Sequence, residues 1–123
     1  MYKKIACFIV TFFLTVLSLS LPAYPIENNN TEILVIAVNG VINPVSSQFI
    51  VKSIQKAEDM NAEAIIIELD TPGGLDASMR DIVKAIMGSK VPVAVYVSPA
   101  GARAASAGAF ITISAHFAAM APG

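Results

Sequence analysis

The chain has 123 residues, is 55% hydrophobic and 14% charged, and carries a formal net charge of −1. This length allows one small domain at most. Six of the eight basic residues and all nine acidic ones follow position 25 without forming a basic cluster, which argues against nucleic-acid binding. The single cysteine, Cys7, excludes an internal disulfide, and the scattered acids predict no metal site and no cofactor.

The N-terminal segment, residues 1–24, has the features of a secretion signal. Lys3 and Lys4 form a positive start, residues 5–21 are mostly apolar, and a small residue suited to cleavage follows. The apolar run is near the lower limit for a bilayer span, so an uncleaved membrane anchor is the alternative. In either case we expect the rest of the chain to be exported, with residues 25–31 as a polar linker.

Apolar runs and amphipathic segments alternate along the remainder, which we expect to form a domain over residues 32–123. The apolar runs predict strands at 33–38, 64–69, 91–97 and 117–120. The segments between them predict helices at 47–60, 76–87 and 104–114, the first capped by Ser46 or Ser47 and the second by Asp76. Such alternation predicts an α/β fold with a parallel sheet, and continuous apolar strands suit burial on both faces.

Two turns rich in small residues each follow a predicted strand. The first is Asp70–Gly74 and the second is Gly101–Gly108. Ligands of parallel sheets bind at the carboxyl ends of the strands, so we treat both turns as one candidate site.

The residues in these turns suit a nucleophile and an oxyanion hole. A glycine pair exposes backbone N–H groups, and Gly74 N–H could face developing negative charge. Ser106 stands at the start of a predicted helix, where the helix dipole is positive, and Ala107 could supply a second N–H. The alternative is structural: Gly73 and Gly74 then form only a tight connection, and Ser106 lets a helix pack closely.

No base for Ser106 is evident in the chain. His116, the only histidine, would lie about 15 Å away along a helix, whereas a base must approach to about 3 Å. Arg103 stays protonated and suits a substrate carboxylate or an internal acid. Asp70 suits a turn cap better than a general acid. Four lysines fall on predicted solvent-facing sides or helix ends: Lys52, Lys56, Lys84 and Lys90.

Three segments, residues 38–42, 68–74 and 100–108, resemble the N-terminal protease domain of the NfeD family, membrane-bound serine proteases of the ClpP class. The resemblance runs from about residue 32 to 123. It implies the ClpP/crotonase fold, a spiral of β-β-α units. It also implies that Ser106 is the nucleophile, that Gly74 and Ala107 form the oxyanion hole and that Gly73 contacts substrate.

The family works with a Ser–Lys dyad whose lysine has no counterpart before Gly123, so we expect the 123-residue chain to be inactive alone. The resemblance implies a membrane-associated serine endopeptidase on the extracytoplasmic side. Its substrate would be a hydrophobic segment of a peptide or membrane protein, such as a stomatin-like protein, and we expect a homo-oligomer. Two alternatives stay open: a non-catalytic interaction module, and a crotonase-like acyl-CoA enzyme, which export argues against because CoA is cytoplasmic.

Overall fold

The computed structural model describes residues 32–122. The predicted signal segment and linker lie outside these residues. The described part alternates strands and helices in the order β1 (Ile33–Asn39), α2 (Pro44–Asp59), β2 (Ala64–Asp70), α3 (Asp76–Gly88), β3 (Val93–Val97), α4 (Ala107–Ser114) and β4 (Phe117–Met120). The four strands form a parallel sheet in the order β1-β2-β3-β4. This confirms the predicted α/β class.

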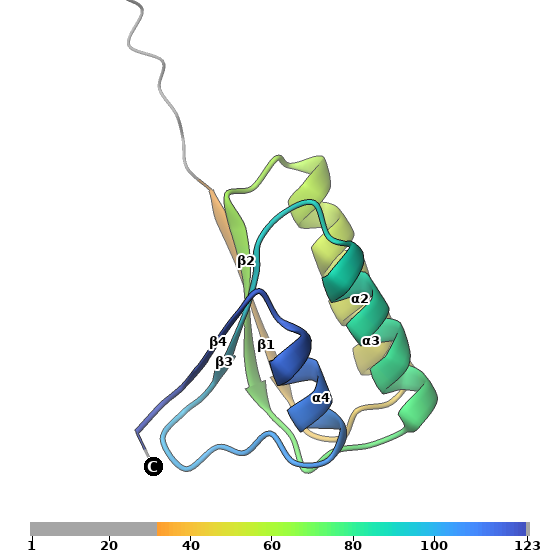
Figure 1. The fold of residues 1–123 in the computed structure, drawn as a ribbon, viewed down its shortest axis with the longest axis vertical. Helices are drawn as coiled ribbons and strands as arrows, with labels where there is room; N and C mark the ends of the chain where they lie inside the picture. Colours follow the sequence, from red (N-terminus) through yellow and green to blue (C-terminus); the bar gives the residue numbers. More distant parts are fainter. Residues whose placement is uncertain (1–31, 123) are drawn as a thin grey trace, which may run out of the picture.

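The three helices lie together on one side of the sheet (Figure 1). Strand β1 shows the consequence, because Val38 is 6% exposed on the helix side while Val35 is 53% exposed on the other. The prediction that the strands are buried on both faces is therefore wrong for β1. Each connection passes over the same face, and an apolar run does not reveal on which side its crossover helices will lie.

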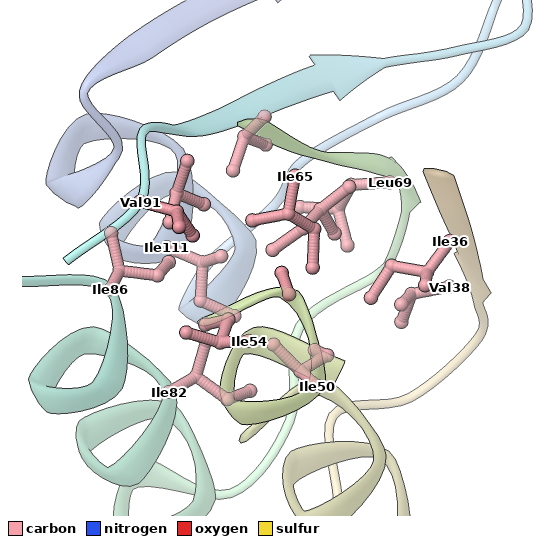
Figure 2. Close-up of a cluster of buried hydrophobic side chains, with 14 of the residues drawn as sticks. Ile36, Val38, Ile50, Ile54, Ile65, Leu69, Ile82, Ile86, Val91 and Ile111 are labelled. Atoms are coloured by element: carbon pink, nitrogen blue, oxygen red, sulfur yellow. The ribbon is translucent and has the colours of Figure 1, made fainter. Parts of the chain in front are cut away.

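Aliphatic side chains fill the space between the sheet and the helices (Figure 2). The middle strand β2 contributes Ile65, Ile67 and Leu69, which are fully buried. Ile82 and Ile86 of α3 are also fully buried and belong to the same cluster. Burying one such side chain contributes about 1.5–3 kcal/mol, so this layer holds the helices against the sheet.

Helix α2 begins three residues earlier than predicted. Asn43 is its N-cap, and the Asn43 side chain accepts hydrogen bonds from Val45 N at 2.9 Å and Ser46 N at 3.0 Å. In the reciprocal bond, Ser46 Oγ accepts from Asn43 N at 2.9 Å. The prediction of Ser46 or Ser47 as the cap is therefore wrong: Ser46 is the reciprocal member of a capping box, and Ser47 is buried within the helix.

Helix α3 begins at Asp76, as predicted. The prediction that Asp76 caps this helix is wrong. Leu75 occupies the N-cap position, and no side chain caps this end. The Leu75 N–H is instead held by Ile42 O at 2.9 Å. Asp76 is the first helical residue and accepts a hydrogen bond from Arg80 at 2.8 Å on the exposed surface, which raises the pKa of Arg80.

Candidate active site

The two small-residue turns lie side by side at the carboxyl ends of β2 and β3. An isolated parallel bridge joins Thr71 of the first turn to Ala104 of the second. Thr71 N donates to Arg103 O at 2.7 Å, and Ala105 N donates to Thr71 O at 3.0 Å. The sheet pairing thus continues past the strand ends and joins the two turns. This agrees with the prediction that both turns lie at the same edge of the sheet.

Ser106 is exposed and stands at the N-cap of α4. Its backbone has φ 53° and ψ −114°, a conformation that costs a non-glycine residue about 1–3 kcal/mol. Its side chain makes no capping hydrogen bond, so the hydroxyl does not close the helix end. Strained backbone of this kind persists where the surrounding structure enforces it, often at functional sites.

Gly73 lies directly against Ser106. It is buried, and its φ of +110° is in the region that favours glycine. A Cβ added to Gly73 would lie 2.8 Å from Ser106 Cβ and 3.3 Å from Ser106 Oγ. The absence of a side chain at Gly73 therefore makes room for the serine.

Gly74 is exposed and pairs with Ile42 in an isolated parallel bridge. Ile42 N donates to Gly73 O at 2.8 Å, and a Cβ added to Gly74 would collide with Ile42 O. Within residues 32–122, the N–H groups of Gly74 and Ala107 donate to no other residue. Each turn thus carries one unpaired backbone donor, that of Gly74 in the first turn and that of Ala107, directly after Ser106, in the second.

Asp70 has a structural contact of the kind the sequence predicted. Its Oδ1 accepts a hydrogen bond from Arg103 N at 3.1 Å, so the carboxylate caps the second turn rather than its own. The partner is the backbone N–H of Arg103, and its guanidinium forms no ion pair in the part of the chain that the structure describes.

The described residues place no base beside Ser106. His116 Nδ1 accepts from Val93 N at 3.1 Å, and His116 N donates to Val93 O at 3.0 Å. Val93 begins β3, so His116 is fixed at the opposite end of the sheet from Ser106. This agrees with the expectation that His116 lies too far from Ser106 to act as its base. The four lysines between residues 32 and 122 are all exposed.

Thr71 is a site residue that the sequence did not single out. It is fully buried, its Oγ1 accepts from Gly73 N at 3.0 Å, and its hydroxyl donates to Gly73 O at 3.3 Å. A threonine between a strand and a Pro-Gly-Gly turn is a weak local signal of such bonding. Its contacts with the second turn join residues distant in the sequence, and local patterns do not reveal them.

Two properties of the described part bear on metal binding and membrane insertion. Across residues 32–122, no three His, Cys, Asp or Glu side chains gather as a metal site would require. Over the same range, every helix is too short or too polar to cross a bilayer.

Solved structures share this architecture. A serine-to-alanine mutant of the 1510-N membrane-bound stomatin-specific protease aligns with a TM-score of 0.73 and 48% identity, over 74% of this chain and 44% of that chain. A lysine-to-alanine mutant of that protease in complex with a substrate peptide gives 0.72 and 49%, over 74% and 42%. ClpP1 from Listeria monocytogenes gives 0.60 and 25%, over 66% and 46%. The ClpP-like fold is thereby confirmed.

Curated sequences give the same relationship. The membrane-bound protease PH1510 of Pyrococcus horikoshii is 48% identical over 101 residues, 82% of this chain and 23% of that protein. The membrane protein NfeD1b of Bacillus subtilis is 37% identical over 112 residues, 91% of this chain and 24% of that protein. The chain spans about a quarter of the length of these relatives. Because the model of the NfeD1b N-terminal domain matches residues 32–123, this chain belongs to the NfeD family.

Proposed function

We propose that this chain supplies the nucleophile and the oxyanion hole of a serine endopeptidase. The observation that carries the proposal is the exposed Ser106, held in a strained backbone conformation at the start of α4 with Gly73 against its side chain. A serine that served only for close packing would be buried and would need no such conformation.

In the proposed mechanism Ser106 Oγ attacks the carbonyl carbon of the scissile peptide bond. The carbonyl oxygen becomes an oxyanion, which the N–H groups of Gly74 and Ala107 stabilise. Removing one oxyanion donor typically costs about 3–4 kcal/mol of transition-state stabilisation. Gly73 contacts the substrate beside this pair.

The base takes the Ser106 proton and returns it to the leaving amine, so that the C–N bond breaks and the acyl group stays on Ser106 Oγ until water releases it. The family resemblance implies a lysine for this role, and the solved relatives include both a serine-to-alanine and a lysine-to-alanine mutant. A lysine base needs burial to lower its pKa. Because the lysines of the described part are exposed, we expect the 123-residue chain alone to cut no substrate.

The relatives support the proposed substrate, partner and location. One is named stomatin-specific and is seen with a substrate peptide, and the curated relatives are named as membrane proteins. We extend this to an exported, membrane-associated homo-oligomer that cleaves hydrophobic segments of a stomatin-like protein on the extracytoplasmic side.

The protease names among the relatives favour a peptidase over the two alternatives. An acyl-CoA enzyme would use the same N–H pair on a thioester carbonyl, and an acyl-CoA would then raise the Tm of the protein. A non-catalytic module would tolerate loss of the Ser106 hydroxyl without a change in any reaction rate.

Peptide cleavage tests the proposal. The full-length gene product should cleave a hydrophobic peptide from a stomatin-like protein, and Ser106→Ala should abolish turnover. Ser114→Ala is the matched control, because Ser114 lies on the same helix and its hydroxyl donates to Ile111 O at 2.8 Å. Cleavage that survives Ser106→Ala, or that Ser114→Ala removes equally, would contradict the proposal.

A further inference from the structure

We infer that Thr71 is a positioning residue for this reaction, which sets the spacing between the two halves of the oxyanion hole. The inference rests on the proposed function. It is carried by the hydrogen bonds that Thr71 makes through its hydroxyl and through its backbone, and a packing contact of its methyl group stabilises the surrounding structure.

The hydroxyl holds the first turn. Oγ1 accepts from Gly73 N at 3.0 Å and the hydroxyl donates to Gly73 O at 3.3 Å, with Thr71 fully buried. Gly73 is the residue at φ +110° whose backbone lies against Ser106. Gly74, with its unpaired N–H, follows directly. The Thr71 hydroxyl therefore fixes the direction in which the first oxyanion donor points.

The backbone of Thr71 holds the second turn. The bridge to Ala104 joins Thr71 to Arg103 and Ala105 on either side of it. Ala105 immediately precedes Ser106. A displacement of Thr71 would therefore move the nucleophile as well as the glycine pair.

The methyl group of Thr71 packs against helix α4 and serves the stability of this packing, whereas the hydroxyl and the backbone position the donors. A Cβ added to Gly108 would lie 2.5 Å from Thr71 Cγ2, so the helix approaches Thr71 as closely as a glycine permits. Ala107, which carries the second proposed donor, directly precedes Gly108. The hydroxyl of Thr71 thus contacts the residue before one donor, and its methyl contacts the residue after the other. Valine lacks the first group and serine lacks the second.

The labelling rate of Ser106 with a fluorophosphonate tests this inference. The reagent forms a bond from Ser106 Oγ to phosphorus, releases fluoride and places a phosphoryl oxygen in the oxyanion hole. In the full-length gene product, Thr71→Val should slow labelling by about 10- to 100-fold, as a sub-ångström misplacement of catalytic groups does. For peptide cleavage the loss should fall on kcat rather than on KM.

Two variants separate positioning from folding. Thr71→Ser keeps the hydroxyl and should label within about threefold of the wild-type rate even where its Tm falls, since positioning depends on the retained bond. Thr112→Val is the matched control, because it removes a hydroxyl that donates to Gly108 O at 2.8 Å inside α4, and it should label normally.

The outcomes distinguish the two proposals. Absence of labelling in the wild type would overturn the proposed function and this inference with it. Normal labelling of both the wild type and Thr71→Val would overturn this inference alone. If Thr71→Val is too unstable to label, Thr71→Ser decides, and a tenfold loss of rate in that variant would also overturn the role of the hydroxyl.

Discussion

Gly73 and Gly40 form a natural matched pair for testing the contact with Ser106. Their φ angles are +110° and +108°, so alanine at either position must adopt nearly the same unfavourable φ. A Cβ at Gly40 would have no atom within 4 Å, whereas a Cβ at Gly73 would lie 2.8 Å from Ser106 Cβ and 3.0 Å from Ala105 O. The difference between the two variants isolates the steric contact of position 73 with the Ala105–Ser106 segment.

The strain common to Gly73→Ala and Gly40→Ala is about 1–3 kcal/mol. For a domain of this size it should lower Tm by roughly 5–20 °C in both variants. In Gly73→Ala, Ser106 Cβ must also retreat by about 0.6 Å to reach an ordinary contact of 3.4 Å. A shift of that size should slow fluorophosphonate labelling by about 10- to 100-fold.

The assay is labelling rate against Tm for both variants in the full-length gene product. Gly40→Ala should lose stability and keep the wild-type labelling rate, while Gly73→Ala should lose both. Equal labelling rates in the two variants would refute the reasoning, because the loss would then follow from strain or instability and not from the position of Ser106.

Further variants test packing and capping. Gly108→Ala should be strongly destabilising because its Cβ would lie 2.5 Å from Thr71 Cγ2. Adding Thr71→Ser removes that methyl and should recover part of the lost Tm. A double variant that recovers no Tm would contradict the contact. Gly74→Ala should unfold or distort the domain, since its Cβ would collide with Ile42 O, and a wild-type Tm would contradict this. Asn43→Ala should cost about 1 kcal/mol in urea unfolding through loss of the α2 cap, and an unchanged midpoint would show that the cap is not needed.

The arrangement of elements was predictable from periodicity, whereas the exact helix starts were not. Runs of β-branched residues identified the strands, and alternation with amphipathic segments gave the parallel sheet. The start of α2 differs from the predicted one because Asn43, Pro44 and Ser46 together form the N-terminal signal, whereas the prediction rests on the serines alone. The start of α3 depends on Ile42 O, which is distant in sequence from Leu75 and therefore gives no local signal.

The candidate site was predictable as a meeting of two turns but not in its details. Both turns follow parallel strands, which brings them to one edge of the sheet. The part played by Thr71 was hidden, because its contacts with Ala104 and Gly108 cross more than thirty positions of sequence. Which glycine touches Ser106 was equally hidden, since the sequence pointed to the Gly74 N–H while the close contact belongs to Gly73.

The central claim is that the Ser106 hydroxyl is the attacking group. Its most direct test is to treat the native full-length gene product with a fluorophosphonate, digest it and locate the adduct by tandem mass spectrometry. The account predicts one adduct, on Ser106, that disappears when the protein is unfolded before treatment. An adduct on another residue, or no adduct on a folded protein that cleaves peptides, would contradict it.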